Sequence, residues 1–293
     1  MSPAPGSPGT ARPPVPEALP LPVVDNHTHL DTTRGGDEPW EVGAALAAAA
    51  AVGVTRSVQI GCEPDSARWT VELLDRTEPW ARSVVGGVAL HPTEATRLQA
   101  EGGTALDDAL ALIDGLARHP RVRVVGETGL DHHWVGPDDV AGRAAQEESF
   151  RAHIEMAKRH DRTLQIHDRD AHADVLRVLA DAGAPERTVF HCFSGDAAMA
   201  RECASRGWYL SFAGTLTFRN ADGLRRALLE VPPEQVLVET DAPYLAPHPH
   251  RGRTNAGYLT PLTVRCIAEV TGRPLERVCA DLDRTSELVH GPW

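Results

Sequence analysis

A chain of 293 residues is long enough for one large α/β domain or for two ordinary domains. Its 42% hydrophobic and 24% charged residues are typical of a globular protein and exclude a wholly disordered or fibrous one. The formal net charge of −12 argues against broad electrostatic binding to nucleic acid or anionic lipid, so a polyanionic substrate would need local cations.

The cysteines and the N-terminal segment indicate the compartment. Five scattered cysteines without a C-x-x-C pair indicate neither a disulfide framework nor a cysteine zinc site, and favour a reducing cytoplasm. The longest apolar run, residues 44–52, is too short for a membrane span. Seven prolines among the first twenty residues rule out the apolar stretch of a secretory signal and predict a flexible tail over residues 1–20.

From residue 21 onward, short β-branched or apolar runs alternate with longer amphipathic stretches. Helical spacing of apolar residues predicts helices over residues 107–118 and 143–159. Strands that alternate with helices imply parallel βα units, and eight of them without a long linker predict one closed (β/α)8 barrel, a TIM barrel, over residues 21–293. The expected strands are residues 22–26, 54–60, 83–90, 121–126, 163–166, 187–190, 208–212 and 236–239.

Residue types that bind metals stand at the C-terminal ends of these strands, where barrel enzymes place their chemistry. In an extended segment His27 and His29 point to the same face, so that both imidazoles can bind one ion. Converging imidazoles and carboxylates would carry a desolvation cost without a cation. The other strand ends bring Glu127, His167, His191 and Asp241.

Six segments of the chain are distinctive: residues 25–31 (DNHTHLD), 90–92 (LHP), 126–131 (GETGLD), 166–169 (IHDR), 191–195 (HCFSG) and 239–245 (ETDAPYL). Together they resemble the signatures of the TatD family of metal-dependent deoxyribonucleases, within the amidohydrolase superfamily. The resemblance covers roughly residues 22–290. One departure lies near the last strand, where the family usually carries Asn-Glu-Pro after a basic pair and this chain has Asn255-Ala256-Gly257.

The resemblance implies a centre of two divalent ions, Mg²⁺, Mn²⁺ or Zn²⁺. His27, His29 and Asp241 would hold one ion, His167 and His191 the other, and Glu127 would bridge them. A lysine bridge, as in phosphotriesterase-like relatives, is disfavoured because the single lysine, Lys158, lies late in the helical stretch before the fifth strand. Such a centre suits phosphodiester hydrolysis by a metal-activated water.

Catalytic roles are expected for Glu127 and for Asp241, the latter as general base or as a ligand only. We expect substrate phosphate to contact His91 and three arginines that follow strands five and eight. The resemblance favours His91 over the arginines, because the family uses the histidine of this His-Pro motif near the substrate. These arginines are Arg169, Arg251 and Arg253.

Further residues admit two interpretations. Cys192 is expected to be a buried spectator thiol rather than a nucleophile, because a metal would occupy the neighbouring His191. The adjacent His132 and His133 are weaker candidates for metal binding. Stacking on an unpaired base and packing within a lid are equally compatible with the aromatic residues Trp134, Phe193 and Tyr244.

The sequence therefore predicts a TatD-like deoxyribonuclease that trims single-stranded or frayed DNA ends. Because candidate phosphate contacts are few and clustered, flexible ends are expected to be preferred to a duplex backbone. A monomer without a stable protein partner or membrane contact is expected. Two alternatives stay open: an amidohydrolase-type hydrolase of a small phosphoester, lactone or amide, and a non-catalytic protein with a residual metal site.

Overall fold

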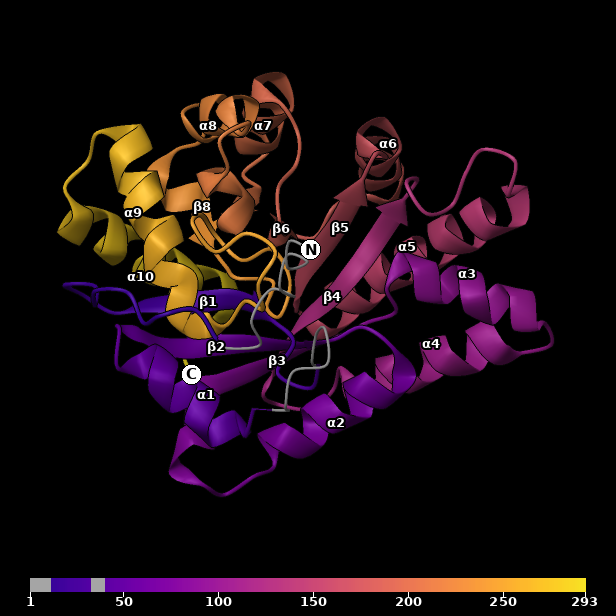
Figure 1. Cartoon of the computed structure of the whole chain (residues 1–293). Helices are drawn as coiled ribbons and strands as arrows, with labels where there is room; N and C mark the ends of the chain where they lie inside the picture. The colour runs from indigo at the N-terminus through magenta and orange to yellow at the C-terminus, as the bar shows by residue number, and fades with distance from the viewer. Residues whose placement is uncertain (1–11, 33–39) are drawn as a thin grey trace, which may run out of the picture.

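The computed structural model describes residues 12–32 and 40–293. Eight parallel strands follow one another around the sheet in the order β1 to β8, with helices outside them (Figure 1). The strands are β1 Val23–Thr28, β2 Val54–Gly61, β3 Val84–Val88, β4 Val122–Asp131, β5 Thr163–Arg169, β6 Thr188–Phe190, β7 Tyr209–Phe212 and β8 Val236–Val238.

The α-helices are α1 Val42–Ala50, α2 Pro64–Leu74, α3 Pro92–Glu101, α4 Ala105–Leu116, α5 Val140–His160, α6 His172–Ala182, α7 Ala197–Ser205, α8 Asp222–Leu228, α9 Thr260–Thr271 and α10 Leu275–His290. Short 3₁₀ turns occupy η1 Pro79–Ser83, η2 Gly214–Thr217, η3 Pro233–Gln235 and η4 Gly257–Leu259. The predicted helices at 107–118 and 143–159 correspond to α4 and α5. None of the helices described is long and apolar enough to cross a membrane.

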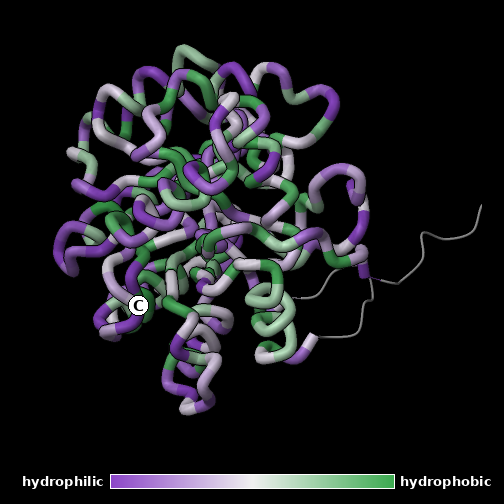
Figure 2. Tube along the Cα trace, turned by 90° about the vertical axis from the view of Figure 1, so that its left-hand side faces the viewer, coloured by the Kyte–Doolittle hydropathy of each residue, from purple (hydrophilic) through white to green (hydrophobic). Residues whose placement is uncertain are grey.

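The barrel closes between its first and last strands. Thr28 forms a parallel bridge with Ala242, just beyond β8, and the backbone N–H of Asp241 donates to the carbonyl oxygen of His27 at 2.9 Å. The strands are covered on both sides, by the barrel interior and by the helices, so most of their residues are buried, polar ones included. Figure 2 shows hydrophobic segments inside the fold and hydrophilic ones toward its outer helices. The predicted (β/α)8 barrel is confirmed.

Three strands run two or more residues further than the sequence predicts, and they do so at the rim. β1, β4 and β5 continue to Thr28, Asp131 and Arg169. The β1–β2 register shifts between Asp25 and Thr28, and the β4–β5 register shifts between Val125 and Thr128. Such bulges place His27 and Glu127 outside the regular ladder, which re-aims their side chains.

Part of the predicted flexible tail packs against the barrel. Residues 1–11 lie outside the described residues, but the N–H of Leu19 donates to the carbonyl of Val52 at 3.0 Å, and Leu19 is buried. The hydroxyl of Tyr258 donates to the carbonyl of Pro13 at 2.6 Å, and Arg265 donates to that of Ala18 at 3.0 Å. Prolines lack N–H groups, but their carbonyls accept hydrogen bonds, and this anchors residues 12–20.

Candidate metal centre

The six predicted ligands come together at the C-terminal end of the barrel. His27 lies in β1, Glu127 in β4 and His167 in β5. His29, His191 and Asp241 directly follow, or lie close behind, the ends of β1, β6 and β8. One potential ligand atom each from His27, His29 and Glu127 lie within 4.8 Å of one another, and the same holds for Glu127, His167 and His191.

Glu127 turns its two oxygens toward different imidazoles. Its Oε1 lies 2.6 Å from Nδ1 of His167 and 2.8 Å from Nε2 of His191. Its Oε2 lies 3.6 Å from Nε2 of His27 and 4.0 Å from Nε2 of His29. One buried carboxylate therefore joins two groups of ligands, as a bridging ligand must.

Asp241 completes the first group. Its Oδ1 lies 3.4 Å from Nε2 of His29 and 3.6 Å from Nε2 of His27, while its side chain stays 15% exposed. The backbone of Asp241 adopts φ of 55°, a conformation that costs energy in a residue other than glycine and is found often at functional sites. Its N–H bond to His27 holds it there.

The tautomers of His27 and His29 test whether a cation fits between them. Nδ1 of His27 lies 2.9 Å from Oε1 of Gln165, and Nδ1 of His29 lies 3.0 Å from the carbonyl oxygen of Ile60. Both partners are acceptors, so each Nδ1 carries the proton and each Nε2 presents a lone pair. These two lone pairs face each other at 3.2 Å, an arrangement that a shared cation satisfies.

His167 and His191 show the same arrangement with carboxylates behind them. Nε2 of His167 donates to Oδ2 of Asp131 at 3.0 Å, and Nδ1 of His191 donates to Oε1 of Glu239 at 3.1 Å. The opposite ring nitrogens then present lone pairs to Glu127. Carboxylate–histidine–metal arrangements of this kind orient metal ligands in proteins, so the residues present fit a centre of divalent cations.

Sequence reasoning assigned no role to Asp131, Glu239 or Gln165. The first two stand inside the segments GETGLD and ETDAPYL, so the motifs contained the signal. Gln165 lies two residues before His167 on β5 and therefore faces the same side of the strand. It also donates from Nε2 to the carbonyl of Asn26 at 3.0 Å, which fixes its Oε1 toward His27.

The protonation of the cluster shows how strongly it attracts positive charge. Burial alone lowers the pKa of His29, but Asp241 and Glu127 raise it to about 9. Burial likewise opposes protonation of His167, whereas Asp131 and Glu127 raise its pKa to about 9. The pKa of Glu127 is held well below its usual value by His191 and His167, against the effect of burial. Metal ions compete with these protons for the same lone pairs.

His91 lies beside the cluster and, unlike the ligand imidazoles, points its ring N–H toward it. It caps α3, and the backbone N–H of Thr93 donates to its Nδ1 at 3.2 Å. The ring proton of a neutral His91 therefore sits on Nε2, which lies 3.3 Å from Nδ1 of His167 and 3.7 Å from Oε1 of Glu127. Burial lowers the pKa of His91 to about 3. His91 thus presents a neutral N–H donor to the centre.

The three predicted arginines lie apart from the ligands. The guanidinium of Arg169 lies 5.6 Å from the ring centre of Trp134, and that of Arg251 lies 4.6 Å from that of Phe218. The N–H of Arg253 donates to the carbonyl of His250 at 3.0 Å. Within the described chain, none of the three side chains forms a hydrogen bond or ion pair with the cluster, so their phosphate contacts stay a prediction.

The structure bears on the aromatic residues and on Cys192, for which the sequence left two interpretations open. Phe193 is buried against Phe212 and is a packing residue, whereas Trp134 is 68% exposed and Tyr244 is 42% exposed. Burial and nearby carboxylates raise the pKa of the Cys192 thiol well above its usual value, which opposes a nucleophilic role.

The adjacent histidines and the single lysine also lie apart from the ligand groups. His132 and His133 face Asp174 and Asp170 and belong to none of the potential ligand groups among the described residues. Lys158 binds Glu155 and the carbonyl of Ala182. A lysine bridge is therefore absent from the described centre.

Comparisons with known proteins agree with this geometry. The family model described as TatD related DNase matches residues 24–289. The chain is 48% identical over 270 residues to the uncharacterized metal-dependent hydrolase TatD of Mycobacterium tuberculosis, covering 92% of this chain and 98% of that protein. It is 33% identical to the metal-dependent hydrolase YabD of Bacillus subtilis over 88% of this chain and 94% of the relative.

A solved structure shares the fold. The TatD homologue YjjV from Escherichia coli K12 superposes with a TM-score of 0.80 at 23% identity, covering 92% of this chain and 98% of that one. The family match spans the strands that carry the ligands, and neighbouring acceptors hold the four imidazoles in tautomers that suit a cation. This chain belongs to the TatD family and is a metal-dependent hydrolase.

Proposed function

We propose that this protein is a deoxyribonuclease that hydrolyses phosphodiester bonds at single-stranded or frayed DNA ends with two divalent cations, Mg²⁺, Mn²⁺ or Zn²⁺. The observation that carries the proposal is the division of Glu127, with Oε1 facing His167 and His191 and Oε2 facing His27 and His29. Two cations held by these residues would supply Lewis acidity to both the entering and the leaving oxygen of an in-line displacement and would lower the pKa of a bound water.

The residues around the centre divide the remaining work. Asp241 faces the cluster through Oδ1 and is partly exposed at the rim, so it is placed to accept the proton of the attacking water as general base. His91 presents its Nε2–H to the centre. It donates a hydrogen bond to a phosphoryl oxygen and so stabilises the negative charge that develops there. Glu239 and Asp131 hold the imidazoles of His191 and His167 in their ligand tautomers.

The description of the matching family, TatD related DNase, supports DNA as the substrate class. The acidic chain supports ends over duplex backbone, because non-specific duplex binding depends on many simultaneous cation contacts. Arg169, Arg251 and Arg253 would supply local positive charge at the rim. The expected location is the cytoplasm, and the expected active form is a monomer.

A substrate screen tests the proposal. Purified protein is assayed on single-stranded DNA, a 4-nitrophenyl phosphodiester and a lactone, each with added Mg²⁺, Mn²⁺ or Zn²⁺. DNA and phosphodiester cleavage that excess EDTA abolishes and divalent metal restores is the expected result. Cleavage that persists in EDTA contradicts the mechanism, and activity on the lactone alone replaces the nuclease with the small-molecule alternative.

A further inference from the structure

A pocket opens beside the metal centre and is lined by residues to which the chemistry above gives no role. It starts at the ligand His29 and Asp31, has a cavity volume of about 110 Å³ and is partly open to solvent. Its apolar walls come from Leu30, Val42 and Pro243. Whatever occupies this pocket lies next to the reacting centre.

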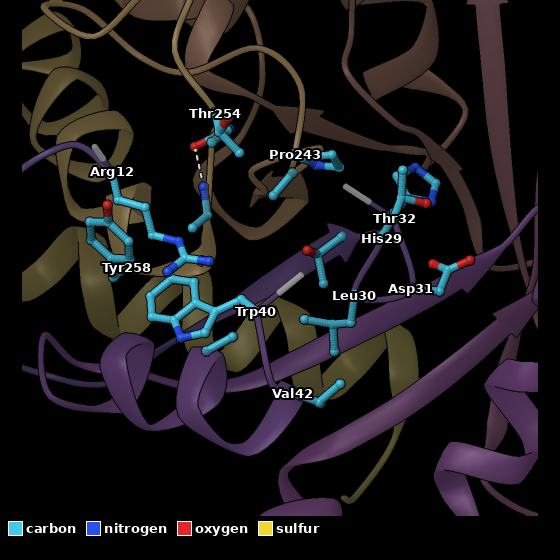
Figure 3. Close-up of a pocket in the computed structure, with 16 residues that line it drawn as sticks. Arg12, His29, Leu30, Asp31, Thr32, Trp40, Val42, Pro243, Thr254 and Tyr258 are labelled. Carbon is cyan, nitrogen blue, oxygen red and sulfur yellow. Dashed lines mark hydrogen bonds between the residues drawn. The ribbon is translucent and has the colours of Figure 1, made fainter. Parts of the chain in front are cut away.

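One wall of the pocket is planar and positively charged. The guanidinium of Arg12 lies 4.1 Å from the ring centre of Trp40, and the Tyr258 ring meets Trp40 edge-on at 5.8 Å. Figure 3 shows Arg12 over the Trp40 ring, with Tyr258 beside both. Guanidinium groups and indoles bind flat π systems through their faces.

The opposite end of the pocket offers an acceptor. Oδ1 of Asp31 accepts a hydrogen bond from Nε2 of Gln59 at 3.0 Å, and its other oxygen receives no hydrogen bond from the described residues. Asp31 and His29 stand together at this end in Figure 3. The pocket thus combines apolar walls, a planar cationic face and a carboxylate acceptor. A heterocyclic base has the complementary combination of flat faces and a polar edge.

Arg12 comes from outside the part of the chain that the family model matches, which begins at residue 24. It is held at the pocket because the next residue, Pro13, accepts from the hydroxyl of Tyr258, itself a lining residue. Farther along the segment, the guanidinium of Arg265 donates a hydrogen bond to the carbonyl of Ala18, and the N–H of Leu19 donates to the carbonyl of Val52. The N-terminal segment therefore completes this pocket.

The pocket lining also contains the departure from the family's usual Glu-Pro. Ala256 and Gly257 both line the pocket. A Cβ on Gly257 would lie 3.3 Å from Cβ of Ala49 and 3.5 Å from Oδ2 of Asp25, so the backbone is closely packed there. A glutamate at position 256 would add a carboxylate to the lining that also contains Arg12.

We propose that this pocket, the Arg12–Trp40 pocket, is a specificity subsite that receives the planar base of the nucleotide next to the cleaved bond. Arg12 and Trp40 form its stacking wall. This rests on the proposed phosphodiester hydrolysis, because it assigns the base on one side of the reacting phosphate to this pocket. The N-terminal segment then acts as part of the substrate site.

Binding to the protein as purified tests the subsite without relying on catalysis. Titration calorimetry compares thymidine 5′-monophosphate with 2-deoxyribose 5-phosphate, which lacks the base. The wild type is expected to bind the nucleotide at least about fivefold more tightly, because base–aromatic stacking contributes ~1–3 kcal/mol. Arg12→Ala and Trp40→Ala should each bring the ratio of the two affinities, nucleotide over sugar phosphate, close to one. Each should change the affinity for the sugar phosphate by less than about twofold.

Matched variants separate stacking from general damage. Arg206 lies 5.1 Å from the ring centre of Trp208 in a similar pair outside the pocket, so Arg206→Ala should leave the ratio unchanged. Trp40→Phe keeps a ring and should keep most of the preference, whereas Ala256→Glu should lose it. A wild-type ratio near one overturns the proposal, and so does an unchanged ratio in both Arg12→Ala and Trp40→Ala.

An activity measurement distinguishes a failure of the subsite proposal from a failure of the proposed function. The substrates are thymidine 5′-(4-nitrophenyl phosphate) and methyl 4-nitrophenyl phosphate, which has no base. With both proposals correct, Arg12→Ala raises KM for the first by about tenfold and leaves the second unchanged. If the wild type cleaves neither of these substrates and does not cleave DNA, the proposed phosphodiesterase activity is wrong. The ratio of the two binding affinities still tests the subsite in that case.

Discussion

Oδ2 of Asp131 lies 3.0 Å from Nε2 of His167, the ring nitrogen that points away from Glu127. Oδ1 of the same carboxylate accepts from the backbone N–H groups of His133 and Trp134 at 3.0 and 2.9 Å. Asp131 therefore ties a metal-ligand tautomer to the loop after β4. The carboxylate orients His167 and also stabilises that loop. We therefore expect removal of the carboxylate to lower metal affinity first.

Asp131→Asn should weaken binding of one divalent ion by about 10–100-fold, because the imidazole loses the acceptor that fixes its tautomer and raises its basicity. Calorimetric titration of chelator-treated protein with Mn²⁺ measures this. Asp170→Asn is the matched control, since Asp170 faces His133 outside the ligand groups. Equal metal affinities for Asp131→Asn and the wild type would refute the orienting role.

Glu127→Ala should lose at least one ion outright, because the carboxylate that joins the two ligand groups disappears and two cations repel each other without it. Elemental analysis of the purified variant gives the metal content per chain. Glu94→Ala serves as control, because Glu94 is another buried carboxylate but pairs with Arg97 on α3. Unchanged stoichiometry in Glu127→Ala contradicts the bridge.

His153 predicts a dependence of stability on pH that is separate from the metal. It accepts the N–H of Leu90 at 3.1 Å through Nε2 and donates from Nδ1 to the carbonyl of Ser149 at 2.7 Å. Burial lowers its pKa to about 4 in the folded protein, against ~6.5 in the unfolded chain. The unfolded chain therefore takes up a proton first as pH falls. This contribution to stability is present above pH ~6.5 and is lost as pH falls toward about 4.

Urea unfolding at pH of about 7.5 and about 5 measures the effect. Between these pH values the wild type should lose about 1–2 kcal/mol more of its free energy of unfolding than His153→Gln does. His133→Gln, which removes an exposed histidine, should behave as the wild type. Parallel pH dependences for wild type and His153→Gln would show that His153 does not titrate in this way.

The form of the DNA should matter as well. We expect faster digestion of a single strand with free ends than of a closed circular duplex at moderate salt, because the rim offers few phosphate contacts. The double variant Arg251→Ala and Arg253→Ala should raise KM more than it lowers kcat if both arginines bind ground and transition states alike. Equal digestion of both DNA forms would contradict the preference for ends.

The sequence by itself determined the barrel and its ligand types. Alternation of apolar runs with helical periodicity requires βα units, and a parallel sheet brings all strand ends to one rim. His27, Glu127 and Asp241 were identifiable because imidazoles and carboxylates at strand ends have few explanations other than a cation. These features are local in the chain, so one-dimensional patterns report them.

Tertiary structure alone decided the tautomers and the pocket. Whether His91 donates while His167 presents a lone pair depends on partners from other elements, Thr93 and Asp131. A proline-rich composition predicts a loose N-terminal segment, yet the Tyr258 hydroxyl and the Arg265 guanidinium hold its carbonyls on the barrel. Contacts between residues about 245 positions apart leave no periodic signal in the sequence, because they arise only when the chain has folded.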